Sequence, residues 1–165
     1  MPASDPLEIL LAHDLWATKT FLTVCEKLPP EQFARKFDMG PGSLQATLTH
    51  ILGAMQTWTD TLMGRPLSQR VDQNGQQYAP AQLLDMQQQL AAAFASAVRI
   101  EPLEKIAKRV RDGKEFTFTR GVIVMQVLTH AMHHRAQCLN MMKQIGVHPL
   151  PPSSVAEWSR LGEGK

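Results

Sequence analysis

The sequence predicts an all-α fold: a four-helix bundle with a long connection between its second and third helices and a short β-hairpin before the fourth. Apolar residues recur at helical spacing in four separate stretches, and Gly and Pro residues separate these stretches. Of the 165 residues, 44% are apolar and 19% are charged, as in an ordinary globular protein. This length fits one core, so we predict a single domain over residues 1–165.

The first helix should start after a cap at Ser4 or Asp5 and end before Pro29-Pro30. Its apolar stripe comprises Leu7, Leu10, Leu11, Trp16, Phe21, Leu22, Val24 and Leu28.

The second helix is predicted from about Leu44 to Met63, because the loop Gly40-Pro41-Gly42 precedes it and Ser43 can cap it. Gly64-Arg65-Pro66 should end it. The polar stretch from there to Pro80 lacks periodicity, so we predict a long surface connection that shapes an entrance to the site.

The third helix should run from Pro80, which suits a first helical turn, to the neighbourhood of Pro102. A hairpin is then predicted within residues 108–120, because the turn dipeptide Asp112-Gly113 precedes alternating β-formers from Phe116 to Thr119.

The fourth helix is predicted from about Gly121 to Ile145, with Gly146 placed to end it. From Val147 the chain is rich in proline, and we expect this tail to wrap over the surface.

Charge gives little support to a nucleic-acid-binding function. The formal net charge is +2, and the basic residues are spread along the chain. A modest group comprises Lys105, Lys108, Arg109 and Arg111, which we interpret as a solvated face. We therefore expect no nucleic-acid partner.

Cysteine usage favours the cytoplasm. Cys25 and Cys138 are the only cysteines, too few for a disulfide framework. The N-terminus carries Asp5, Glu8 and Asp14 where a secretory signal would need positive charge. No stretch approaches the roughly 18 apolar residues of a membrane span. We predict a cytoplasmic protein with no membrane partner.

His130 and His134 are the first candidates for chemistry. They lie four residues apart in a predicted helix, so both side chains project from one face. This spacing suits two ligands of one metal ion, and it equally suits surface histidines or core histidines with hydrogen-bond partners. His50 lies in another apolar run. No glutamate follows His130, so the H-E-x-x-H peptidase motif is absent.

Two of the predicted helices carry a more specific pattern. SLQATLTHILGAMQTW starts at Ser43 and contains His50 and Trp58, and VLTHAMHHRAQCLNMMKQIG contains His130 and the run His134-Arg135-Ala136-Gln137. This combination resembles the signature helices of the DinB/YfiT-like family of metal-binding bundles. The resemblance extends over nearly the whole chain and departs from the family pattern at Ala136, where glycine is common.

The resemblance implies that His50, His130 and His134 bind one divalent metal ion. Zinc or nickel is expected first, then iron, manganese or copper. Three neutral imidazoles would leave the ion its charge and an open position, which lowers the pKa of a water or polarises a substrate oxygen or sulfur.

Several functions are consistent with such a site. Members of the family and its relatives include metal-dependent hydrolases and enzymes that use low-molecular-weight thiols, and dimers are frequent. We expect a homodimeric enzyme of that kind with a small-molecule substrate or thiol. The alternatives are a non-catalytic metal-binding stress-response protein and a dimerisation scaffold.

Other residues near these motifs have competing interpretations. His133 should point about 100° away from His134, at the flank. Cys138 continues the ladder of His130 and His134, where a thiolate could bind zinc, but a lone helical cysteine is more often a small buried residue. Trp58 could wall the pocket or be a core aromatic residue.

His13 and Asp14 could reach the rim of the site, with Asp14 orienting an imidazole, although surface positions are favoured for both. Arg135 and Gln137 are expected to serve packing or hydrogen bonding between helices.

Overall fold

The structure is a computed structural model that describes residues 4–161. It is mostly helical with one two-stranded antiparallel sheet, which confirms the helical prediction and the hairpin at this level. The elements are α1 (Pro6–Cys25), α2 (Pro30–Phe33), α3 (Leu44–Leu62), α4 (Pro80–Ile100), β1 (Ile106–Arg111), β2 (Lys114–Thr119), α5 (Arg120–Gln144) and α6 (Val155–Arg160).

Side-chain caps start three of the four long helices. Asp5 precedes α1, Ser43 precedes α3 and Thr119 precedes α5, and each accepts a hydrogen bond from a backbone N–H of the first turn. Of the two predicted caps for the first helix, Ser4 and Asp5, Asp5 is the one that caps α1, and Ser43 caps α3 as predicted. The first helix ends at Cys25, earlier than its apolar stripe suggested.

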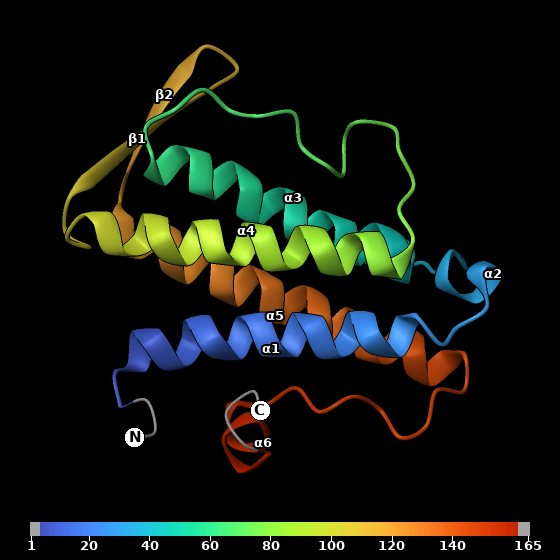
Figure 1. Cartoon of the computed structure of the whole chain (residues 1–165). Coiled ribbons are helices and arrows are strands. Elements are labelled where there is room, and N and C mark those ends of the chain that lie inside the picture. Colours follow the sequence, from blue (N-terminus) through green and yellow to red (C-terminus); the bar gives the residue numbers. More distant parts are fainter. Residues whose placement is uncertain (1–3, 162–165) are drawn as a thin grey trace.

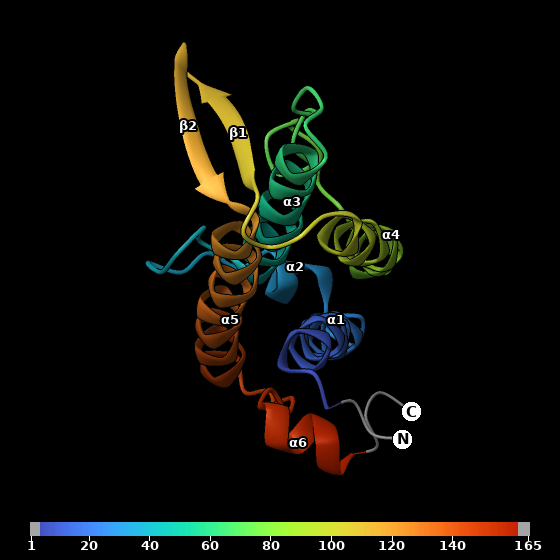
Figure 2. The ribbon, with the colours of Figure 1, turned by 90° about the vertical axis from the view of Figure 1, so that its left-hand side faces the viewer.

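The four long helices lie along one another, and successive neighbours are α1, α4, α3 and α5, with α5 again beside α1 (Figure 2). Figure 1 shows that α3 and α4 run in the same direction, so the chain between them must return along the length of a helix. For the 19 residues of α3 this is about 28 Å. Residues 63–79, the long connection between α3 and α4, make this return beside α3. The parallel direction of the two helices explains why the connection is long.

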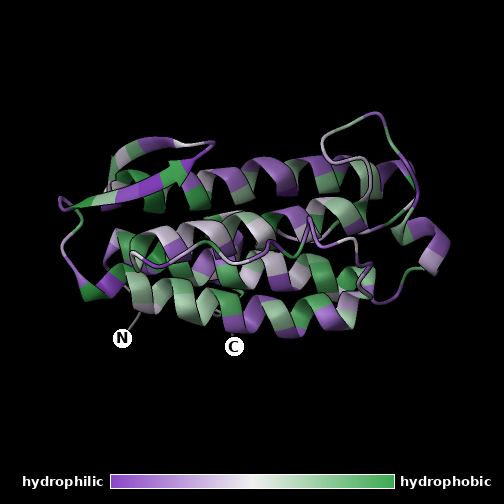
Figure 3. Ribbon diagram, turned by 90° about the horizontal axis from the view of Figure 1, so that it is seen from above, coloured by the Kyte–Doolittle hydropathy of each residue, from purple (hydrophilic) through white to green (hydrophobic). Residues whose placement is uncertain are grey.

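Buried apolar side chains from the long helices form two clusters, one around Phe21, Leu48 and Met141 and the other around Phe94 and Ile123. Figure 3 shows hydrophobic and hydrophilic residues alternating around each helix, as expected when only one side of a helix is buried. Within residues 4–161, none of the helices is both long and apolar enough to cross a membrane.

The hairpin turns at the predicted dipeptide Asp112-Gly113, where both residues have positive φ, as a type I′ turn requires. Phe118 of β2 packs edge-on against Trp58 of α3, with ring centroids 5.5 Å apart. The Arg109 guanidinium lies over the Trp58 ring, 4.8 Å from its centroid. Arg109 is half-buried, so the basic group is not simply a solvated face.

Two short helices were not predicted. α2 follows Pro29 directly, and α6 interrupts the proline-rich tail. Ser154 and Glu157 form a reciprocal capping box at the start of α6, a pattern visible in the sequence. Trp158 anchors α6 because its ring is buried.

Candidate metal centre

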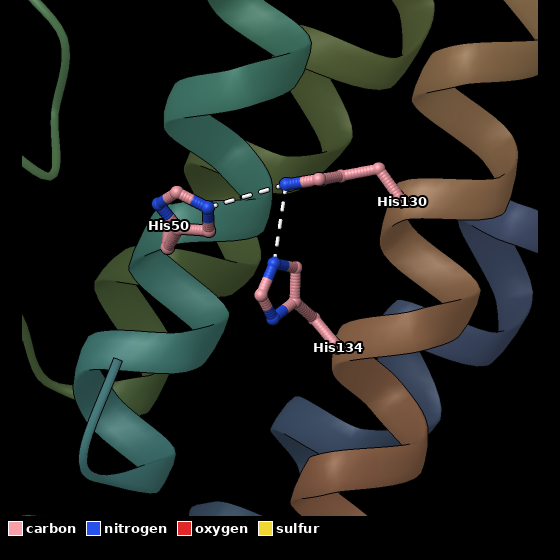
Figure 4. A group of neighbouring side chains, drawn as sticks. All are labelled: His50, His130 and His134. Carbon is pink, nitrogen blue, oxygen red and sulfur yellow. Dashed lines mark hydrogen bonds between the residues drawn. The ribbon is translucent and has the colours of Figure 1, made fainter. Parts of the chain in front are cut away.

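His50, His130 and His134 meet between α3 and α5 (Figure 4). The Nε2 atom of His130 lies 3.2 Å from Nε2 of His50 and 3.1 Å from Nε2 of His134. One ligand atom from each residue lies within 4.8 Å of the others. The helical spacing brings His130 and His134 together, whereas His50 reaches them only because α3 packs against α5.

The spacing of these atoms suits a divalent metal ion. Three imidazole nitrogens bound tetrahedrally at 2.0–2.1 Å from one ion would lie about 3.4 Å apart, close to the two separations observed here. All three histidines are partly exposed, and the His50 side chain retains 30% of its accessible surface. The donor atoms are therefore suitably placed, and each of the three residues retains some exposure.

The surroundings favour the neutral imidazoles of His130 and His134. Burial, followed by the neighbouring His134 and His50, lowers the pKa of His130 to about 4. Burial also lowers the pKa of His134, although a hydrogen bond to Gln137 opposes this shift. Neutral imidazole is the form that coordinates a metal ion.

The long connection between α3 and α4 supplies hydrogen-bond partners around His50. Asp72 Oδ2 lies 2.9 Å from His50 Nδ1, and because a carboxylate only accepts, His50 donates. Arg70 donates to both oxygens of Asp72, at 2.8 and 2.7 Å. Burial would raise the pKa of Asp72, but the hydrogen bonds from Arg70 and His50 outweigh it and lower this pKa. The carboxylate therefore remains charged beside the imidazole.

Sequence reasoning did not identify Asp72 or Arg70. It predicted a surface connection, whereas Asp72 and Arg70 turn inward onto α3 and are half-buried. The only signal was a pair of opposite charges two residues apart in a stretch without periodicity. Such a pair does not reveal which helix it will contact.

Gln137 makes the corresponding contact with His134. Its Oε1 atom accepts a hydrogen bond of 2.8 Å from Nδ1 of His134, one helical turn away. Gln137 thus bonds within α5, not between helices as predicted. Arg135 does connect two helices, because it donates to Asp14 and Thr18 of α1.

A polar cavity of about 380 Å³ opens beside His50. Its lining comes from the segment before α3, the start of α3 and the long connection, and includes Lys36, Gln45, Thr49, Asp72, Gln73 and Gln77. A larger cavity of about 670 Å³ lies beside the hairpin, where no histidine contributes to the lining. We place the candidate site at the smaller cavity, since His50 of the histidine cluster and its partner Asp72 both line it.

A model described as the DinB family matches residues 3–158 of the chain. The chain belongs to the DinB family. The crystal structure of a DinB-like protein from Bacillus cereus ATCC 10987 superposes with a TM-score of 0.66 at 20% sequence identity, covering 86% of this chain and 91% of that one. This similarity establishes a DinB-like fold. No curated protein matches the chain.

In this DinB-family chain, His133 and Cys138 lie outside the histidine cluster. His133 is exposed and its Nε2 atom lies 3.2 Å from Nε2 of Gln137. Cys138 has no accessible surface, and burial raises the pKa of its thiol to about 12. Cys138 is therefore the small buried residue that is usual for a lone helical cysteine.

His13 and Asp14 are neither on the surface nor at the rim of the site. Asp14 forms a buried ion pair with Arg135, at 2.5 Å. Nε2 of His13 lies 2.9 Å from the carbonyl oxygen of Ser153, and its ring packs near Trp158. These contacts join α1 to α5 and to the C-terminal tail. Both predicted surface positions are wrong because Arg135 and the tail cover this part of α1.

Proposed function

We propose that this DinB-family protein is a divalent-metal-dependent enzyme for a small-molecule substrate, either a hydrolase or a transferase that uses a low-molecular-weight thiol. The convergence of three Nε2 atoms from His50, His130 and His134 carries the proposal. Zinc or nickel would suit these imidazole donors best, and iron, manganese or copper could replace them.

A divalent ion bound by three neutral imidazoles would keep its full charge and an open position, so it would activate a water or a thiol, or polarise a substrate oxygen or sulfur. Among the described residues the cluster contains no fourth His, Cys, Asp or Glu. Structural zinc sites usually have four protein ligands. Together with the cavity that His50 lines, this favours a catalytic site over an ion that only stabilises the fold.

The protein's own groups then have distinct roles. The three histidines would hold the ion, and the amide and hydroxyl groups of the cavity would bind a polar substrate. We assign Asp72 no role as a general base, because Arg70 and His50 already donate to its oxygens.

We also propose that α1, α3, α4 and α5 constitute a four-helix bundle, that residues 1–165 form one domain, and that the protein is a cytoplasmic homodimer. In the order α1, α4, α3 and α5, each helix contacts the next, and α5 contacts α1 again, which supports the bundle.

The homodimer is supported by exposed apolar side chains on α5, those of Val122, Met125 and Met132. Light scattering should give twice the chain mass of 18.4 kDa.

Elemental analysis of protein purified without chelator tests the metal site. The wild type should contain about one ion per chain. His134→Ala should lose stoichiometric binding and retain its helical circular dichroism, while His133→Ala, at the exposed neighbouring position, should bind as the wild type does. Unchanged metal content in His134→Ala would overturn the three-histidine assignment.

Catalysis requires a separate test. Metal-loaded wild type should hydrolyse a member of a panel of small esters and amides or form adducts between thiols and electrophiles. His134→Ala should lose that activity and His133→Ala should keep it. Activity that is equal in all three proteins would contradict a metal-dependent enzyme.

A further inference from the structure

Two hydrogen bonds select the tautomers of two of the histidines. His50 donates from Nδ1 to Asp72, and His134 donates from Nδ1 to Gln137. A neutral imidazole carries one hydrogen, so Nε2 of each ring must present a lone pair. Both lone pairs lie next to Nε2 of His130, where the proposed ion would bind.

Arg70 does not weaken this assignment. Its Nη2 atom lies 3.3 Å from His50 Nδ1 and 2.7 Å from Asp72 Oδ2. If Arg70 donated to a lone pair on Nδ1, that lone pair would also face the negative oxygen of Asp72 at 2.9 Å. The arrangement with His50 and Arg70 both donating to Asp72 avoids this repulsion.

The space for both partners is provided by glycines. A Cβ atom at Gly53, on α3, would lie 2.0 Å from Oδ1 of Asp72, and one at Gly40 would lie 2.2 Å from Oε1 of Gln137. With such a Cβ present, Asp72 and Gln137 would have to shift from the positions in which they contact His50 and His134. Gly40 also has a φ of +51°, which favours glycine by itself, whereas no such backbone requirement applies to Gly53. In the middle of a helix, Gly53 is best explained by the approach of Asp72.

We propose that Asp72 is a positioning residue for the metal centre, that it holds His50 with Nε2 free to coordinate, and that Gly53 admits it to α3. Gln137 and Gly40 serve His134 in the same manner. The inference rests on the proposed metal-binding function. The long connection between α3 and α4 then contributes to the metal centre, because it carries Asp72 and its partner Arg70.

Zinc affinity, measured by competition with a chromophoric chelator, tests the proposal. Removing a partner of a ligand histidine commonly weakens metal affinity 10- to 100-fold. We expect Asp72→Ala and Gly53→Ala each to weaken zinc binding by about this factor, and Asp72→Asn, which keeps an acceptor and loses the charge, to weaken it less. Alanine favours a helix more than glycine does, so Gly53→Ala should not act by weakening α3.

Matched controls are available. Asp85→Ala removes an exposed carboxylate from α4, and Gly121→Ala places a Cβ at an ordinary 3.5 Å contact in α5. Both should bind zinc as the wild type does. If Asp72→Ala and Gly53→Ala also retained the zinc affinity of the wild type, the positioning role would be refuted. The three-histidine metal site would be unaffected by that result.

Nitrogen NMR of the histidine rings in metal-free protein gives an independent readout. His50 should carry its hydrogen on Nδ1 in the wild type and lose this preference in Asp72→Ala, with unchanged helical circular dichroism. An Nε2–H tautomer in the wild type would overturn the proposal. Absence of zinc binding by the wild type would instead refute the proposed function, and the tautomer measurement would still test the role of Asp72.

Discussion

Cys25 and Cys138 carry the only thiols in the chain, and burial in the fold makes both unreactive. Neither side chain has accessible surface, and burial raises the pKa of both, that of Cys138 to about 12. Because the thiolate is the reactive form, we expect no detectable reaction with a disulfide reagent in native buffer and two reacting thiols per chain in denaturant. Rapid modification of the native protein would contradict the burial of the two thiols.

The buried pair of Asp14 and Arg135 should be a major determinant of stability. The two side chains retain 5% and 4% of their accessible surface, so removal of one leaves an uncompensated charge in the core. Asp14→Ala should lower the free energy of unfolding by about 3–5 kcal/mol, measured by urea denaturation.

An exposed carboxylate provides the comparison for Asp14. Asp85→Ala should change the free energy of unfolding by no more than about 0.5 kcal/mol. Replacement of both members of the pair, by Asp14→Leu with Arg135→Met, should recover much of the loss, since no charge then remains unpaired. A loss below about 1 kcal/mol in Asp14→Ala would mean that water reaches Arg135 readily.

At the scale of elements, Asp60 ties the end of α3 to the long connection. It is fully buried and accepts hydrogen bonds from Nε of Arg65, at 2.6 Å, and from the backbone N–H of Ser68, at 2.8 Å. Burial would raise the pKa of Asp60, but these bonds and the charge of Arg65 lower it below its usual value. The ionised carboxylate is therefore favoured more in the folded chain than in the unfolded chain.

This shift predicts how stability depends on pH. A carboxyl group with a lowered folded pKa stabilises the fold fully above its unfolded pKa, about 3.9, and loses that contribution as the pH falls through the folded value. Asp60→Asn should be less stable than the wild type by about 1–3 kcal/mol at pH 7, and the difference should narrow below about pH 4. A difference in urea denaturation that stays constant from pH 7 to pH 3 would contradict this.

Elements were easier to predict than the contacts between them. The helices and the hairpin depend on local features of the sequence, so they could be located from it. These features are the cap at Ser43, the dipeptide Asp112-Gly113 and the apolar stripes. The meeting of His50 with His130 depends on packing between α3 and α5, and only the family resemblance indicated it. Asp72 lies in a stretch with no periodic pattern, so neither local propensity nor the resemblance linked it to His50.

For the whole molecule, the histidine cluster joins helices that are distant in sequence. His50 belongs to α3 and the other two histidines belong to α5, while residues 63–79 bring Asp72 onto the same place. An unfolded chain would not hold these groups together, so a metal ion should bind the folded state preferentially. Metal binding and folding are then thermodynamically linked.

This linkage predicts a metal-dependent melting temperature. At free zinc of about 100 times the dissociation constant, the fold gains about 2.7 kcal/mol, which for a chain of this size raises the melting temperature by about 5–11 °C. Differential scanning fluorimetry should show this rise in the wild type and its reversal by chelator. Magnesium, which prefers oxygen ligands, should produce no comparable rise. His134→Ala should melt at the same temperature with and without zinc, because two imidazoles hold the ion weakly. If zinc raised the melting temperature of this variant as much as that of the wild type, the stabilising ion would bind elsewhere.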